Sequence, residues 1–178
     1  MDTALVTKDT FTVIQERKSV RNFTGEVVHK DDLIKLLKAA MAAPAAIHMY
    51  PWKFIVITDK YKLQQLENGL PFAKMLTNAG TAIVVCANPK DAAMGSEAFA
   101  ILDCACASEN LLLAAEAAGL GAVWTAVYPN PSLIHFVQKT LGIPEHVIPL
   151  NVIPVGHPAG NDKPQEKFDT RNIHWEAW

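Results

Sequence analysis

The sequence has almost no excess of charge and few cysteines, and both shortages exclude classes of protein. Its 16 Lys and Arg residues stand against 18 Asp and Glu residues, which gives a net charge of −2. No run of Lys or Arg creates a local positive field, so nucleic acid is not expected as a partner. Three cysteines in a chain long enough to fold without crosslinks favour a reducing compartment, and we expect the protein to be cytoplasmic.

Metal-binding, redox and membrane signals are also missing. The six histidines are scattered, with no His-Glu-x-x-His motif and no clustered Cys/His spacing, so no metal site is expected. Cys104 and Cys106 lie in a helical stretch at a spacing that points them to different faces, which excludes a redox pair. The start of the chain lacks the pattern of a secretory signal. The apolar stretch 98–118 carries three acidic residues, which exclude a lipid-facing helix and a membrane partner.

Hydrophobic residues, in contrast, make up 50% of the 178 residues, enough for a sizeable core in one domain spanning 1–178. The mean hydropathy of +0.11 is high for a monomer and indicates apolar surface buried by a second copy, although a well-filled core is the alternative. Near the end of the chain, Phe168, Trp175 and Trp178 also need a surface to cover. The segment after Val155 therefore either folds back on its own domain or reaches across a dimer, and its length favours the dimer.

The spacing of apolar residues predicts helices and strands in alternation. We expect helices over 11–16, 31–42, 60–67, 96–118 and 131–141, and strands over 54–58, 81–87, 123–127 and 147–155. Asp59 and Asn130 are expected to cap two of the helices, and Gly69 and Gly142 to lie beyond their ends. The glycines at 119 and 121 follow a helix and precede a strand, the reverse of a dinucleotide-binding fingerprint, so a Rossmann loop is excluded.

The first candidate site is the segment Arg17-Lys18-Ser19-Val20-Arg21, beside a predicted helix end. Its cations and hydroxyl suit a phosphate, because Arg presents a planar fork of donors and Ser adds a short hydroxyl donor. A solvated basic turn is the alternative, since charged clusters are common on loops.

A second candidate is the loop 43–52, Ala-Pro-Ala-Ala-Ile-His-Met-Tyr-Pro-Trp, which leads from a helix into a strand. Loops of this kind often carry sites, and small side chains let a planar ring approach the backbone. The alternative is an ordinary connection with Trp52 in the core and His48 as a hydrogen-bonded loop residue.

Taken in order along the chain, these segments resemble the nitroreductase family. The family's opening Arg-x-Ser-x-Arg/Lys is matched by Arg17, Ser19 and Arg21. Its Asn-Leu-Leu-Leu-Ala-Ala is matched at 110–115, its Gly-Leu-Gly-x-x-Trp at 119–124, and Gly-His-Pro at 156–158 and Ile-His-Trp at 173–175 complete the set. The resemblance covers nearly all of the chain from Arg17 to Trp178, and the ordered set carries it rather than any single piece.

The resemblance implies an α+β fold, a three-layer α/β/α sandwich around a mixed, mainly antiparallel sheet. It also implies a homodimer with exchanged C-terminal arms and FMN held between the subunits. The cofactor-binding residues it implies are Arg17, Lys18, Ser19 and Lys167 at the phosphate; Arg21 and Lys74 at the pyrimidine end of the ring; Pro44, Ala45, Ala46 and His48 from the partner subunit; and Trp124, Thr125 and Ala126 near the flavin N5. Simpler alternatives are an exposed helix lysine for Lys74 and ordinary strand pairing for Thr125 and Ala126.

The chain departs from the family pattern in the loop that would line the ring. Where the family has Pro-Ser-Ser/Ala-x-Asn-x-Gln-Pro-Trp, this chain places methyl, imidazole and phenol groups at Ala45, His48 and Tyr50. After Trp124 it has Thr125 and Ala126 where relatives often carry Glu-Gly or Gly-Gly. The phosphate end is therefore intact, whereas ring contacts and substrate choice stay open.

The activity implied is that of an NAD(P)H-dependent FMN oxidoreductase working by a ping-pong mechanism. A reduced nicotinamide would give hydride to the flavin N5 and leave, and a small acceptor such as a nitroaromatic, a quinone or a free flavin would then take two electrons. His48 and Tyr50 are the candidate substrate contacts, because they could supply protons or hydrogen bonds. The alternatives are a flavin-binding homologue without turnover and a specialised reductase of the same fold, of the dehalogenase or ene-reductase type.

Overall fold

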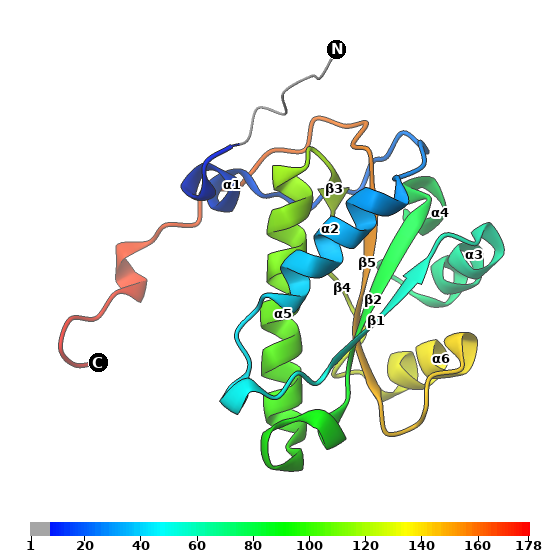
Figure 1. The fold of residues 1–178 in the computed structure, drawn as a ribbon. Coiled ribbons are helices and arrows are strands. Elements are labelled where there is room, and N and C mark those ends of the chain that lie inside the picture. Colours follow the sequence, from blue (N-terminus) through cyan, green and yellow to red (C-terminus); the bar gives the residue numbers. More distant parts are fainter. Residues whose placement is uncertain (1–7) are drawn as a thin grey trace.

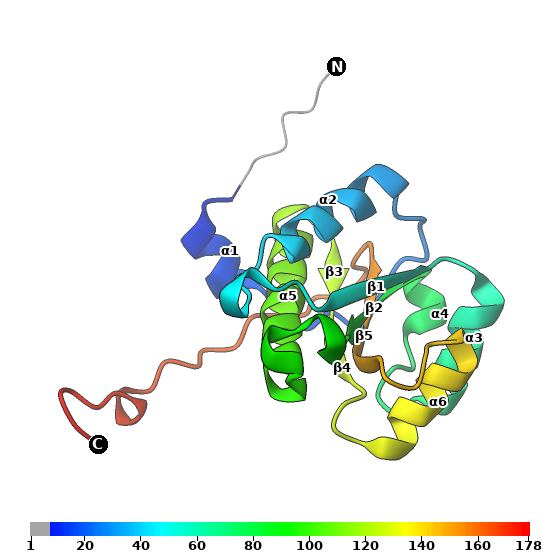
Figure 2. The same ribbon diagram turned by 60° about the horizontal axis from the view of Figure 1, so that its bottom comes forward.

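The structure is a computed structural model and describes residues 8–178. A central sheet lies between two layers of helices (Figure 1). Both views place α2 (Lys30–Met41) and α5 (Glu97–Ala117) on one face of the sheet, and α3 (Lys60–Gly69), α4 (Leu76–Ala79) and α6 (Pro131–Leu141) on the other (Figures 1 and 2). The short helix α1 (Thr10–Glu16) lies beside α5. The predicted three-layer α+β architecture is confirmed.

The sheet has five strands: β1 (Trp52–Ile57), β2 (Thr81–Ala87), β3 (Gly121–Ala122), β4 (Thr125–Ala126) and β5 (Ile148–Gly156). Their order is β1-β2-β5-β3, and β4 also pairs with β5. These strands pair antiparallel, while a bridge from Ser19 to Ala122 adds a parallel element. Because β2 and β5 are the inner strands, nearly all of their side chains are buried on both faces, and their sequences are mostly apolar, with Thr81 and Asn151 as buried polar exceptions.

The strand predicted over 123–127 is only partly correct: Thr125–Ala126 forms β4, but the edge of the sheet is interrupted at Val123 and Trp124. Pairing with β5 stops after Ala122 and resumes at Thr125, so Val123 and Trp124 leave the ladder. On β5, Pro154 lies between the two paired stretches and has no N–H to donate. The interruption therefore has a cause on the neighbouring strand, and it leaves irregular backbone at the edge of the sheet.

Local signals define the ends of the helices well. The Asn130 side chain accepts hydrogen bonds from the first backbone N–H groups of α6, and Gly142 ends that helix with a φ of 66°. Asp59 likewise caps α3. The expectation that Gly69 lies beyond α3 is wrong. It is the last helical residue, and the ring of Phe136 from α6 occupies the space that a Cβ there would need.

Two apolar clusters fill the space between the sheet and its two helical layers. Leu36, Leu111 and Ile153 belong to the cluster under α2 and α5, and Leu66 and Val137 to the one under α3 and α6. Among the described helices α5 alone is long and apolar enough to cross a membrane, but it packs along the sheet and against α2. Its apolar character is that of a core helix.

The three cysteines differ in burial: Cys86 and Cys104 lie in the core, and Cys106 lies on the surface. Cys104 is buried and Cys106 is exposed, so the two lie on different faces of α5 as predicted. Burial raises the pKa of the Cys86 and Cys104 thiols to about 12, so both stay protonated and unreactive in the folded protein.

A buried polar pair links α5 to β5, and its removal is expected to be costly. The Asn151 Nδ2 donates to the Ser108 Oγ over 2.9 Å, and the Ser108 Oγ donates to the Cys104 carbonyl over 2.8 Å. Replacing Ser108 by alanine leaves the Asn151 amide without its acceptor in the core, so the free energy of unfolding should fall by about 2 kcal/mol in urea denaturation. The matched change Thr140→Ala removes a half-buried hydroxyl that only donates to the Phe136 carbonyl, and about 1 kcal/mol or less is expected there. Equal losses in the two variants would contradict this account.

The remaining short helices are of the 3-10 type: Ala46–His48, Pro89–Asp91, Ala93–Gly95 and Thr170–Asn172. After β5 the chain runs past α1 and then away from the rest of the domain (Figures 1 and 2). Phe168 and Trp175 are mostly exposed on this segment, and Trp178 is fully exposed. The C-terminal arm, residues 161–178, thus presents aromatic side chains that its own domain does not cover.

Candidate functional site

The basic segment 17–21 is fixed against the edge of the sheet beside the interruption. The Val20 backbone N–H donates to the Ala122 carbonyl over 3.1 Å, and the Val20 side chain is buried. Two residues after Arg21, Phe23 bridges to Pro158. The segment therefore runs between β3 and the start of the C-terminal arm, and its polar side chains line a cavity.

That cavity has a volume of about 540 Å³ and is strongly basic. It is lined by Arg17, Lys18, Ser19, Arg21, Asn161, Asp162, Lys163, Gln165 and Lys167. The structure thus brings together the four sequence-predicted phosphate residues, of which Lys167 comes from the C-terminal arm, and adds a second cation of that arm, Lys163. Such a concentration of Arg and Lys in a chain of net charge −2 favours an anionic ligand, and the Ser19 hydroxyl offers a neutral donor beside them.

Two of these cations are held by carboxylates of α5. The Arg17 Nε lies 3.3 Å from the Glu109 Oε1, and the Lys18 Nζ lies 3.0 Å from the Glu116 Oε2. The ion pairs with α5 therefore orient the first two side chains of the segment 17–21. Sequence reasoning treated both glutamates only as charges that exclude a membrane span.

A second cavity, of about 360 Å³, opens where the edge strand is interrupted. It is lined by Arg21, Pro71, Phe72, Lys74, Met75, Val123, Trp124, Thr125 and Ala126. Apolar and aromatic side chains face the segment 123–126, and Lys74 is held at the rim because its Nζ donates to the Glu67 carbonyl over 2.7 Å. The cavity suits a planar, largely apolar ligand with a polar edge near the two cations Arg21 and Lys74.

Arg21 joins the two cavities, since it lines both. Thr125 contributes backbone rather than a hydroxyl to the second one, because its Oγ1 donates to the Val152 carbonyl within the sheet. The two cavities form one site with a basic end and a mainly apolar end. A ligand that fits it carries an anionic group at one end and a ring at the other.

The loop 44–50 lines neither cavity of its own chain. It stays on the α5 side of the sheet, where the Ala46 backbone N–H donates to the buried Asp103 Oδ1 over 3.1 Å. Ile47 and His48 have φ values of 46° and 59°, and both side chains are exposed. Two consecutive residues in the left-handed region are strained, which is common where a loop presents side chains to a ligand. Tyr50 lies against Trp52, with 5.4 Å between the ring centroids.

The model of the nitroreductase family matches residues 14–72 and 62–157, which include both cavity-forming segments 17–21 and 121–126. The chain belongs to the nitroreductase family.

Similar nitroreductases cover nearly the full length of the chain. A protein of Methanothermobacter thermautotrophicus, provisionally described as an NADH dehydrogenase/NAD(P)H nitroreductase, is 39% identical over 170 residues, or 96% of this chain and 88% of its own. A solved structure from Parabacteroides distasonis with the same description is 47% identical, with a TM-score of 0.91, over 96% of this chain and 99% of its own. An FMN-dependent nitroreductase from Clostridium difficile R20291 is 26% identical, with a TM-score of 0.86, over 94% of this chain and 99% of its own. The chain is an NAD(P)H-dependent oxidoreductase with the nitroreductase fold.

Sequence reasoning missed several residues that line the site of this nitroreductase. Lys163 lies in the basic cavity beside Lys167, and Phe72 and Met75 lie in the second cavity. The four-residue spacing of Lys163 and Lys167 in a polar segment was a usable signal, whereas nothing local marks Phe72 or Met75. They reach the site only because α4 and the loop before it pack beside the interrupted edge strand.

Proposed function

We propose that this chain is an FMN-dependent oxidoreductase that passes electrons from NAD(P)H to small acceptors such as nitroaromatics, quinones or flavins. The observation that carries the proposal is the pair of cavities that share Arg21, one basic and one lined mainly by apolar and aromatic side chains. FMN has a phosphate at one end and a planar ring at the other, with a flexible chain between them. The family's FMN-dependent member from Clostridium difficile supports the same assignment.

The residues present fit FMN at both ends. Arg17, Ser19, Lys163 and Lys167 would hold the phosphate, with Lys18 oriented toward it by Glu116. Arg21 and Lys74 would face the pyrimidine edge of the ring, and the backbone of 124–126 would lie against its centre. Of this backbone, Trp124 lies outside the ladder because the edge strand is interrupted there, while Thr125 and Ala126 pair with β5 on one side only.

When bound, FMN supplies the chemistry of hydride acceptance and donation at its N5. The role of Arg21 and Lys74 is to place positive charge beside the pyrimidine edge, where negative charge accumulates on reduction. A nicotinamide and an acceptor would use the same face of the bound ring in turn, as a ping-pong mechanism requires. His48 and Tyr50 would then hydrogen-bond or protonate an acceptor, provided that a second subunit brings them there.

A homodimer supplies that second subunit in our proposal, and apolar exposure supports it. Large apolar side chains are exposed along α1, α2 and α5: Phe11, Ile14, Ile34, Met41 and Leu102. The aromatic C-terminal arm leaves its own domain and would be exchanged with the partner, while Pro44, Ala45, Ala46 and His48 would line the partner's ring. In this proposal residues 1–178 form one FMN-binding domain in a cytoplasmic protein, with neither nucleic acid nor membrane as a partner.

The first test is the visible spectrum of the purified protein, followed by anaerobic addition of NADH and of NADPH. We expect a flavin spectrum that bleaches with at least one of the two, because the proposed function requires reduction of the flavin by a nicotinamide. A flavin spectrum that neither donor bleaches would instead support a flavin-binding homologue without turnover. A colourless protein that cannot be reconstituted with FMN would overturn the proposal.

A further inference from the structure

Glu116 is placed where neither its own helix nor its surroundings favour a carboxylate. It lies in the last turn of α5, where the helix dipole is negative and no basic residue of that turn offsets it. Its residue is only 7% exposed, so its charge is also largely removed from water. Because both the helix dipole and burial disfavour this carboxylate, it needs a compensating interaction, and such unfavourable placements are often found where a residue has a functional role.

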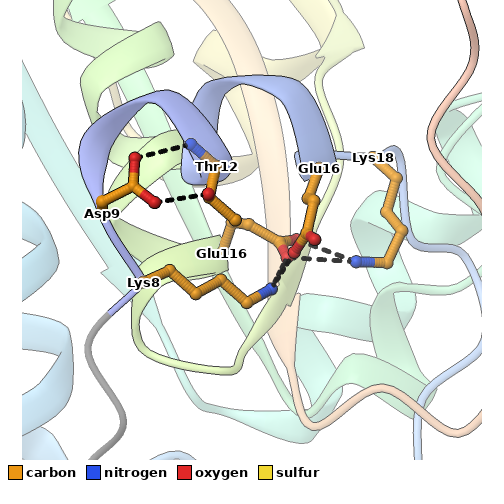
Figure 3. A network of polar contacts seen from close by, with 6 residues as sticks. All are labelled: Lys8, Asp9, Thr12, Glu16, Lys18 and Glu116. Carbon is orange, nitrogen blue, oxygen red and sulfur yellow. Dashed lines mark hydrogen bonds and ion pairs between the residues drawn. The ribbon is translucent and has the colours of Figure 1, made fainter.

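The compensation comes from two lysines on opposite sides of the carboxylate (Figure 3). The Lys8 Nζ donates to the Glu116 Oε1 over 2.7 Å, and the Lys18 Nζ contacts both carboxylate oxygens, at 3.2 and 3.0 Å. Lys8 is also 2.7 Å from the Glu16 Oε2. Burial raises the pKa of Glu116, but the two ammonium groups outweigh it and leave the pKa below its ordinary value. Glu116 is thus ionised throughout the neutral range.

The two lysines differ in what they contact beyond Glu116. Lys18 lines the basic cavity next to Ser19, whereas Lys8 does not. An ammonium group has three N–H donors, so Lys18 can hold the Glu116 carboxylate and still direct a donor into the cavity. Without that carboxylate, a long and flexible lysine side chain would lose about 2 kcal/mol of rotamer entropy on being fixed there by the ligand alone.

We propose that Glu116 is a positioning residue of the phosphate site, which fixes Lys18 in the basic cavity before the ligand arrives. The inference rests on the proposed function, since it assumes that this cavity takes the phosphate of FMN. Glu116 makes no contact with the ligand itself. It acts through Lys18. The four residues Lys8, Glu16, Lys18 and Glu116 are linked by ion pairs, and their two positive and two negative charges cancel.

The test compares FMN with riboflavin, which has the same ring and lacks the phosphate. Apoprotein is titrated with each flavin, and the ratio of the two affinities isolates the contribution of the phosphate site. In Glu116→Gln the carboxylate charge is lost while the side-chain shape is kept. We expect FMN to bind about tenfold more weakly and riboflavin to bind as in the wild type, so that the ratio falls. General damage to the fold would weaken both flavins alike and leave the ratio unchanged, which would overturn the inference.

Two further variants show whether Glu116 acts through Lys18. The change Lys8→Met removes the other partner of Glu116 and should leave the ratio unchanged. In a Lys18→Met background, Glu116→Gln should have no further effect on the ratio, because the side chain that it positions is gone. A similar drop in that background would overturn the inference, as would tighter FMN binding in Glu116→Gln, which would mean that the carboxylate only opposes the phosphate charge.

If Glu116→Gln does not fold, Glu116→Asp provides the same test. It keeps the charge but draws the carboxylate back by one methylene, so a positioning role still predicts a lower ratio. A wild-type ratio in Glu116→Asp would overturn the inference. A wild-type protein that binds both flavins equally would remove the phosphate assignment and the inference together, whereas a wild-type preference for FMN that survives Glu116→Asp removes the inference alone.

Discussion

Replacing Gly156 with alanine is expected to lower the free energy of unfolding by about 3 kcal/mol. Gly156 ends the inner strand β5, and a Cβ there would lie 2.6 Å from the Ala79 carbonyl oxygen and 2.9 Å from the Phe23 Cδ1. The closest neighbour is backbone at the end of α4, so it cannot turn aside as a side chain would. Thermal denaturation should show a melting temperature lower by roughly 6–12 °C.

The matched control for Gly156 is Gly95, because a Cβ at Gly95 would have open space around it. Gly95 has a φ of 64°, so Gly95→Ala carries only the cost of a left-handed backbone, about 1 kcal/mol. If both variants melted at the same temperature, close packing at the end of β5 would not be the cause of the loss.

Replacing Arg21 with alanine is expected to weaken FMN binding by roughly 10- to 100-fold, the value of one or two charge-assisted hydrogen bonds. Arg21 lines both the basic and the apolar cavity, so it can contact a ligand that occupies the two cavities at once. The Arg21 Nη1 lies 3.4 Å from the Ser19 carbonyl, a weak contact that a bound anion can replace. The measurement is a titration of apoprotein with FMN, followed by flavin fluorescence.

Two comparisons sharpen the Arg21 experiment. Lys62→Ala removes the same charge from the exposed start of α3, away from both cavities, and should leave FMN affinity unchanged. Arg21→Lys keeps the charge but loses the planar fork of donors, so it should restore only part of the affinity. An Arg21→Ala protein that binds FMN as the wild type does would remove Arg21 from the proposed site.

The sequence predicted the elements whose causes are local. The helix over 131–141 was correct to the residue, because Asn130 and Gly142 act on their immediate neighbours. The strand over 81–87 was correct because a fully buried strand is apolar at every position. The break at Val123 and Trp124 could not be foreseen in the same way, since Pro154, on the facing strand, lies thirty residues further along the chain.

The residues of the candidate site also fall into those that the local sequence indicates and those that only the fold brings together. The segment 17–21 could be singled out as a candidate phosphate-binding loop because three cations and a hydroxyl lie within five residues, although a solvated basic turn is the alternative for this segment taken alone. Lys163 and Glu116 acquire meaning only when the fold brings the C-terminal arm and the end of α5 to that loop. In a sequence without its fold, Glu116 is one acid in an apolar helix, and nothing marks it as the partner of Lys18.

The position of β5 in the chain also bears on how the protein is made. This strand pairs with β2 on one side and with β3 and β4 on the other. It is nevertheless the last of the five strands to be synthesised. Until Gly156 has left the ribosome, β2, β3 and β4 lack their common partner strand, and the arm that lines the basic cavity has not yet been made. Because β5 follows β2, β3 and β4 in the chain, the sheet cannot be completed before residue 156 has been made, and until then the apolar β2 segment lacks its inner partner strand.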